Sequence, residues 1–275
     1  MKKILLAFDG IHFSGGAFDF ARRMNELNPV LLTGIFLPQA EYANFWSYGD
    51  ALTAPLFIPY IANDEDKKVE ENTSRFESLC QKHGIEYRVH IDSYDFALPE
   101  LKKETRFADL LVIGSETFYN NLASGGPDEY LQDTLHGMEC PMIVVPENLS
   151  FPETNILCYD GGESSVYAIK QFAYLFPELA EKPTLLVFVN KEEGEHEIPD
   201  EINIEELTTR HYPDLTITKL NMESKKYFNN WLSEKKGAIV ICGSYGRSLF
   251  SRLLRKSFIS GIIKDHLLPV FITHK

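Results

Sequence analysis

A glycine-rich and basic segment near the end of the chain carries the clearest signal for chemistry. Residues 243–248 read Gly-Ser-Tyr-Gly-Arg-Ser and follow a short apolar run. Gly243 and Gly246 let a loop turn successive backbone N–H groups inward, which forms a nest for an anion. Guanidinium groups also pair with phosphate oxygens bidentately. The segment and its continuation hold four cationic residues: Arg247, Arg252, Arg255 and Lys256. This pattern favours a phosphate-binding loop.

The continuation of this segment also suits an anion. Ser257 stands just before a helix expected near Phe258–His266. A serine in that place caps the helix and faces its positive end, where a phosphate is stabilised. Phe258 would begin this helix and lie beside the same phosphate. A solvated basic turn with an ordinary serine cap is the alternative interpretation.

A second group of polar residues follows two expected strands of the same half. Asp160, Gly161 and Gly162 come directly after the run Ile156–Tyr159. The carboxylate can accept hydrogen bonds from a ribose hydroxyl or an adenine amine, and the glycines permit close backbone approach. Val189 ends another expected strand, where its backbone can pair with a base edge. Because ligands of open parallel sheets lie beyond the carboxyl ends of the strands, these residues predict an adenine-nucleotide site.

Short apolar runs rich in β-branched residues indicate the strands that must position these side chains. The expected strands are Ile4–Phe8, Val30–Leu37, Tyr87–Ile91, Leu110–Ile113, Met142–Val145, Ile156–Tyr159, Thr184–Val189, Leu215–Leu220, Ile239–Cys242 and Val270–Thr273. Helices are expected at Gly16–Leu27, Asp66–His83, Ala97–Arg106, Glu129–Met138, Ser164–Phe176, Ile202–Arg210, Tyr227–Lys235 and Phe258–His266. This alternation predicts the α/β class with doubly wound parallel sheets.

The chain repeats this pattern once. The run Ile4–Gly10 resembles Ile156–Gly162, and Pro141–Val145 resembles Pro269–Thr273. The breakers in Pro146–Glu153 mark the join. We therefore expect two tandem five-stranded domains, at residues 1–148 and 153–275. The short linker should hold them against each other as an intramolecular pseudo-dimer.

One long segment interrupts the first half. Pro38–Asp64 has no helical period and is rich in aromatic residues. Loops of this length inside compact domains are often functional. An aromatic cover, a lid over an apolar small molecule and a subunit contact are the alternatives.

Composition bounds the partners and the compartment. The 275 residues carry a net charge of −13, which argues against a general nucleic-acid binder. No apolar stretch is long enough to span a bilayer, and no histidine pair suggests a metal centre. The four cysteines show no paired spacing, and reduced thiols are expected. These features predict a cytoplasmic protein that binds neither nucleic acid nor membrane.

The arrangement resembles the universal stress protein family. Its ATP-binding members carry an aspartate after the first strand and G-x-x-G, nine residues, then G-[ST] after the fourth. Gly243, Gly246 and Ser257 match the loop motif, but Lys256 stands in place of its second-to-last residue, a glycine. Asp160 and Val189 match the adenosine-side positions. The resemblance covers both halves and implies an adenine nucleotide-binding fold of the α-hydrolase type.

The first half departs from the ATP motif. Gly114-Ser115-Glu116 keeps one glycine and places a carboxylate in the would-be phosphate loop. Gly125–Glu129 is acidic where the second half is basic, and like charge beside phosphate is unfavourable. Asp9, Gly10, Ser14 and Ile35 remain candidates for an adenosine-like cleft. We expect a structural or partner-binding role for this half.

The resemblance implies a stress-response protein that senses ATP in its second half, with Mg²⁺ held mainly by the phosphates. The phosphates would lie among Gly243, Gly246, Arg247, Ser248, Lys256, Ser257 and Phe258. No general base with an orienting partner is visible, so no more than slow hydrolysis is expected. The alternative is an interaction module without nucleotide, acting through protein partners or a homo-oligomer, because family members commonly pair through their last strands. Met142–Val145 and Val270–Thr273 would reproduce that pairing within one chain.

Overall fold

The structure of the protein is a computed structural model. It describes residues 1–8, 11–37, 41–42, 59–60, 63–91, 97–115, 138–190, 197–221, 230–232, 234–243 and 268–273. Several expected features lie outside them: most of the Pro38–Asp64 segment, Glu116, the acidic stretch 125–129 and the helix expected at 258–266.

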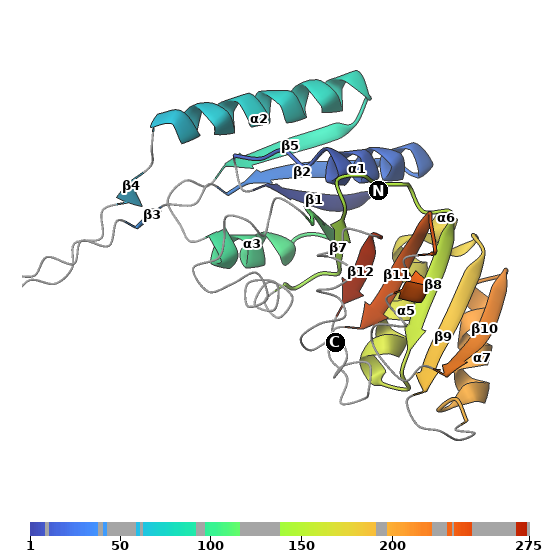
Figure 1. Ribbon diagram of the computed structural model, residues 1–275. Helices are drawn as coiled ribbons and strands as arrows, with labels where there is room; N and C mark the ends of the chain where they lie inside the picture. The colour runs from blue at the N-terminus through green and yellow to red at the C-terminus, as the bar shows by residue number, and fades with distance from the viewer. Residues whose placement is uncertain are drawn as a thin grey trace, which may run out of the picture.

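Ten strands form one continuous, mostly parallel sheet in the order β10-β9-β8-β11-β12-β7-β6-β1-β2-β5 (Figure 1). The first half contributes β1 (Lys2–Phe8), β2 (Val30–Phe36), β5 (Glu86–Ile91), β6 (Leu110–Gly114) and β7 (Met142–Val145). The second half contributes β8 (Thr154–Tyr159), β9 (Thr184–Asn190), β10 (Leu215–Asn221), β11 (Ala238–Gly243) and β12 (Val270–Thr273). Each half therefore has the same strand order, with its first strand in the middle. The expected α/β class with doubly wound parallel strands is confirmed, and the two expected five-stranded sheets are joined into one.

The two halves of the sheet meet where β7 and β12 run antiparallel to each other. Ile143 lies opposite Phe271, with the pairs Val144 and Val270 and Met142 and Ile272 beside it. Both strands are buried along their whole length. An all-apolar strand is the pattern of a strand that is covered on both faces.

Helices cover both faces of the sheet. The helices are α1 (Gly15–Leu27), α2 (Asn63–Lys82), α3 (Ala97–Thr105), α5 (Glu163–Leu175), α6 (Pro177–Ala180) and α7 (Glu201–His211). One buried cluster joins alternate strand residues to α1, α2, α5, α6 and α7. The other strand residues form a second cluster with Leu101 of α3 and with Leu232. Side chains of a strand alternate between faces, so each strand contributes to both cores.

Two short strands lie apart from the main sheet. β3 (Glu41–Tyr42) and β4 (Pro59–Tyr60) pair antiparallel within the long segment of the first half. The prediction of an irregular segment up to Asp64 is wrong at its end, because α2 already begins at Asn63. The role of the Pro38–Asp64 segment as an aromatic cover, a lid or a subunit contact stays a prediction.

Candidate functional site

Four of the expected nucleotide-binding residues, with Gly161 next to Asp160, come together at the carboxyl edge of the second half. Asp160 follows β8 directly, Gly243 ends β11, and Val189 lies near the end of β9. β8 lies between β9 and β11, parallel to both. The sheet thus brings these positions to three neighbouring strand ends, as the sequence predicts. Gly246, Arg247, Ser248, Lys256, Ser257 and Phe258 lie outside the described residues.

Asp160 holds the turn that leads into α5. Its Oδ1 accepts a hydrogen bond from the backbone N–H of Gly162 at 2.8 Å and one from the hydroxyl of Ser165 at 2.6 Å. The same hydroxyl also lies 2.8 Å from the carbonyl oxygen of Gly162. The aspartate is only partly buried, so its carboxylate lies at the surface of the site while it fixes the turn. Sequence reasoning missed this local role.

Gly161 makes the turn feasible. Its φ is +77°, a conformation that L-residues with a side chain rarely adopt. A Cβ there would lie 2.8 Å from the Cβ of Pro199, which precedes α7. The turn is therefore held between α5 and the start of α7.

Gly243 has a packing role in addition to any role in a phosphate loop. A Cβ at this position would lie 2.3 Å from the carbonyl carbon of Ser164, in the first turn of α5. The overlapping atoms belong to the backbone of Ser164, which cannot move aside as the end of a flexible side chain can. The end of β11 and the N-terminus of α5 approach each other this closely only because residue 243 is glycine.

The corresponding region of the first half contains an internal carboxylate at the start of α1. Glu147, just after β7, accepts hydrogen bonds from the N–H groups of Gly15 at 2.8 Å and Gly16 at 3.3 Å. It also accepts one from the hydroxyl of Ser14 at 2.9 Å, and Ser14 itself caps α1. A carboxylate is stabilised by the positive end of a helix. This anion site is filled by the chain, which sequence reasoning did not find.

Two thiols lie beneath the second-half site on neighbouring strands. Cys158 of β8 and Cys242 of β11 are buried, and burial raises the pKa of the Cys242 thiol to about 12, with a smaller contribution from the charge of Asp160. The pKa of Cys158 is raised in the same direction, again chiefly by burial. Both thiols are neutral at physiological pH and act as small apolar side chains. As expected, all four cysteines are free, and all are buried.

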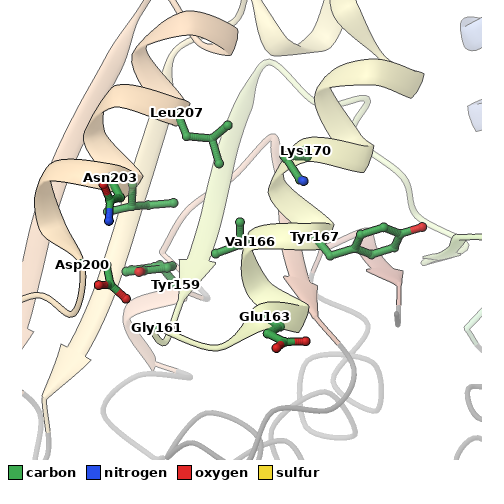
Figure 2. Close-up of a pocket in the computed structure, with 10 residues that line it drawn as sticks. Tyr159, Gly161, Glu163, Val166, Tyr167, Lys170, Asp200, Asn203 and Leu207 are labelled. Carbon is green, nitrogen blue, oxygen red and sulfur yellow. The ribbon is translucent and has the colours of Figure 1, made fainter.

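A pocket of about 460 Å³ lies next to the Asp160 turn, between α5 and α7 (Figure 2). Its lining residues are Tyr159, Gly161, Glu163, Val166, Tyr167, Lys170, Asp200, Asn203, Ile204 and Leu207. Tyr159 is fixed by a hydrogen bond of 2.7 Å from its hydroxyl to the carbonyl oxygen of Pro199. The sequence motifs did not point to this pocket, because its walls come from two helices whose polar residues follow no known motif.

Within the part of the chain that the structure describes, no group of three or more His, Cys, Asp or Glu side chains is arranged to hold a metal ion. No helix in that part has the length and apolar character that crossing a membrane requires. The carboxylate of Asp160 can accept hydrogen bonds from a ligand, and Gly161 and Gly243 allow close approach to the backbone.

Comparison with known proteins gives the fold. No family model matches the chain, and no curated protein matches it in sequence. A universal stress protein from Archaeoglobus fulgidus matches in structure with a TM-score of 0.68 at 13% identity, over 100% of this chain and 96% of that one. The chain has the universal stress protein fold. A functionally unknown protein from Pseudomonas aeruginosa matches with a TM-score of 0.53 at 11% identity, over 100% of this chain and 92% of that one.

Proposed function

We propose that the second half binds an adenine nucleotide, in the form of ATP, at the carboxyl edge of β9, β8 and β11. The observation that carries this proposal is the convergence of Asp160, Gly243 and the backbone near Val189 on three neighbouring strand ends. In open parallel sheets this edge is where ligands bind. Asp160 would hold the ribose or the base, and the backbone of Val189 would pair with the adenine.

The phosphates would lie against the loop that follows β11. Gly243 and Gly246 would supply inward N–H groups, and Gly161 would let the opposite turn approach closely. Arg247, Ser248, Lys256, Ser257 and Phe258 would complete the surround, mostly through backbone groups and charge. Mg²⁺, if it enters with ATP, would be held mainly by the phosphate oxygens.

The proposed role is sensing of the nucleotide in a cytoplasmic stress response. The thiols beneath the site are neutral and buried, so neither offers a nucleophile. Asp160 already accepts hydrogen bonds from Gly162 and Ser165, an arrangement that suits holding a ligand better than moving a proton. No more than slow hydrolysis is proposed.

The first half would act as a structural partner. Its helix terminus at Ser14 and Gly15 already carries the carboxylate of Glu147, which disfavours a phosphate there. We propose that residues 1–148 and 153–275 are two domains that pair through β7 and β12 as an intramolecular pseudo-dimer. The antiparallel pairing of these two strands supports this arrangement.

The test is calorimetric titration of the full chain with ATP, with and without Mg²⁺, after a check for co-purified nucleotide. We expect about one equivalent to bind, and Asp160→Ala to weaken binding at least about tenfold, or ~1.4 kcal/mol. Gly246→Val should abolish binding. The matched control is Asp9→Ala, the equivalent change in the first half, which should leave the affinity unchanged.

A negative result has a defined meaning. If the folded protein neither binds ATP nor carries nucleotide from its source, the nucleotide proposal is wrong, and a Lys256 side chain that closes the site is the simplest cause. A scaffold that acts through protein partners would then be the working hypothesis. Unchanged affinity of a folded Asp160→Ala variant would remove Asp160 from the site.

A further inference from the structure

The pocket between α5 and α7 has a counterpart in the first half, between α1 and α2, that the chain itself fills. The two halves can be placed on each other by their strand registers. Phe8 ends β1 beside Phe36 of β2, and Tyr159 occupies the same place in β8 beside Phe188 of β9. Phe8 and Tyr159 are therefore equivalent positions, each at the end of the first strand of its half.

The helices correspond as well. α1 and α5 have the same length and nearly the same series of buried positions, which aligns Phe18 with Val166 and Arg22 with Lys170. α2 precedes β5 and α7 precedes β10, with three residues between helix and strand in each half. When β5 and β10 are aligned by their strand registers, Phe76 of α2 corresponds to Ile204 of α7, and Arg75 corresponds to Asn203. The residues that line the pocket in the second half thus have named counterparts in the first half.

In the first half three of these counterparts, Phe8, Phe18 and Arg75, contact the ring of Phe13. This ring stacks on Phe8 with centroids 4.8 Å apart and lies 6.0 Å from the ring of Phe18. The guanidinium of Arg75 lies 4.3 Å above its centroid. Stacking and cation–π contacts both favour a planar aromatic group in this place. In the first half, the region between α1 and α2 therefore accommodates an aromatic ring.

Among its described residues, the second half has no aromatic ring in the same place. The loop that carries Phe13 spans residues 9–14, whereas its counterpart spans only residues 160–162 and ends in two glycines. Phe18 is 4% exposed, but its counterpart Val166 is only partly buried and faces the pocket. The cavity of about 460 Å³ lies where the described residues of the second half place no ring.

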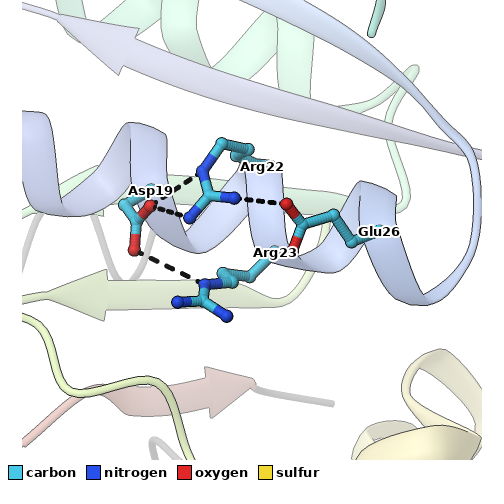
Figure 3. Close-up of polar contacts among 4 residues, drawn as sticks. All are labelled: Asp19, Arg22, Arg23 and Glu26. Atoms are coloured by element: carbon cyan, nitrogen blue, oxygen red, sulfur yellow. Dashed lines mark hydrogen bonds and ion pairs between the residues drawn. The ribbon is translucent and has the colours of Figure 1, made fainter. Parts of the chain in front are cut away.

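The two halves also differ in the charged residues around this basic position of the helix. Arg22 donates hydrogen bonds to the carboxylates of Asp19 and Glu26 on its own helix (Figure 3). In α5 the corresponding positions hold Tyr167 and Tyr174, which carry no charge. Lys170, the counterpart of Arg22, makes no ion pair with any residue in the described part of the chain. Lys170 is partly buried, and an ammonium group without a carboxylate partner favours an anion that reaches it.

We propose that the pocket between α5 and α7 binds a small aromatic carboxylate, whose ring takes the place of Phe13 and whose carboxylate pairs with Lys170. Tyr159, Val166 and Ile204 provide the apolar contact surface for the ring. A cavity of this volume suits a small ligand, and such sites combine apolar walls with a few polar groups. The proposal is independent of nucleotide binding, because the ligand and nearly all contact residues differ.

The acidic residues of the pocket limit the charge of the ligand. Glu163 and Asp200 lie at the end of the pocket next to Gly161, while Lys170 lies toward the other end (Figure 2). Lys170 lies seven positions after Glu163 in α5, which corresponds to about 10 Å along the helix axis. A carboxylate at Lys170 would lie about one and a half to two helical turns from Glu163, whereas a multiply charged phosphate would be repelled by the two acidic groups. One negative charge at one end of an aromatic ring fits this distribution.

Phenylacetate is the probe for the first experiment, with its neutral amide and with cyclohexylacetate as matched comparisons. Saturation-transfer NMR and calorimetry on the full chain should show binding of phenylacetate. The amide should bind at least about tenfold more weakly because it lacks the charge, and cyclohexylacetate should also bind more weakly because it lacks the planar ring. Lys170→Met should abolish the preference for the acid over the amide, and Arg22→Met should not change it.

Two further variants test the location of the ring. Val166→Phe should fill the pocket and abolish phenylacetate binding, and Leu207→Phe serves as a second filling variant if the first does not fold. Phe13→Ala should create a new ring-binding pocket beneath Arg75 in the first half. The proposal is overturned if phenylacetate does not bind the folded wild-type chain at millimolar concentration. It is also overturned if folded filling variants bind phenylacetate as well as the wild type does.

Discussion

Ser14 and Glu147 lie 133 residues apart in the sequence, and their side chains are joined by a hydrogen bond of 2.9 Å at the start of α1. Ser14 donates its hydroxyl proton to the carboxylate and accepts a hydrogen bond from the backbone N–H of Ala17. Glu147 in turn accepts from the N–H groups of Gly15 and Gly16. The contact fixes the segment after β7, which leads into the second half, to the first helix of the chain.

Removal of this carboxylate should destabilise the first half. Glu147→Ala would leave two N–H groups of α1 and the hydroxyl of Ser14 without their acceptor. We expect the free energy of unfolding to fall by about 1–2 kcal/mol, the usual cost of losing a helix cap with its hydrogen bonds. Urea denaturation measures the effect. Glu153→Ala, at an exposed position in the same linker, is the control and should change stability by less than about 0.5 kcal/mol.

Close backbone packing at Gly243 predicts a second effect on stability. In Gly243→Ala the new methyl group would overlap the backbone of Ser164, so strand and helix must separate. We expect a loss of about 1–3 kcal/mol, as for other overpacked sites. Gly84→Ala is the comparison, since nothing lies within 4 Å of a Cβ there and only the strain of its positive φ is added. Equal losses in thermal or urea unfolding would show that the packing at residue 243 can relax.

The buried thiols predict how stability depends on pH. Burial raises the pKa of Cys80, Cys140 and Cys242 to about 12, whereas in the unfolded chain each thiol titrates near its ordinary value of about 8.5–9. Above that value the unfolded state releases protons that the folded state retains, so unfolding is favoured. The stabilisation is complete below about pH 8.5 and is lost progressively as the pH rises toward 12.

Urea unfolding at pH 8 and at pH 10.5 checks this prediction. The free energy of unfolding should be lower at the higher pH, and the decrease should be smaller in Cys242→Ala than in the wild type. A Cys242→Ala variant with the same pH dependence as the wild type would show that this thiol does not contribute. Alkylation of native protein by iodoacetamide at pH 8 should also be slow, because the thiolate is scarce and covered.

Hydrogen exchange should distinguish the middle of the sheet from its ends. β7 and β12 each have a neighbouring strand on both sides, and both are buried. Their amides, including those of Ile143 and Phe271, should exchange with the protection of the global unfolding reaction. Amides in β5 and β10, which end the sheet among the described strands, should exchange faster. Exchange measured by mass spectrometry that is equally fast in β7 and β10 would show that the two halves separate readily.

The positions of the main-sheet strands along the chain could be predicted because each buried strand is a short apolar run between polar segments. Met142–Val145 and Val270–Thr273 have the same bounds in the prediction and in the structure, and the ends of the other strands of the main sheet differ by one or two residues, whereas β3 and β4 were not predicted. The short helix Pro177–Ala180 was not predicted, because it begins so soon after Leu175 that the pattern shows only one helix.

The site could be predicted only in part. Sequence places Asp160 and Gly243 at strand ends, because both follow apolar runs directly. Their local contacts, with Ser165 and with the backbone of Ser164, depend on how α5 packs. The roles of Glu147 and Phe13 also depend on residues far away in the sequence, at Gly15 and at Arg75. No local pattern carries such contacts. The nucleotide contacts of Asp160, Val189 and the loop after Gly243 stay predictions.

The antiparallel meeting of β7 and β12 has a consequence for signalling between the halves. Because strands within each half are parallel, the reversal at this seam turns the carboxyl edge of one half to the opposite rim of the sheet from that of the other. Ligands bound at the carboxyl edges of the two halves would therefore lie on opposite rims of the sheet. The three residue pairs of the seam give a direct route by which a small shift in register or twist in one half reaches the other.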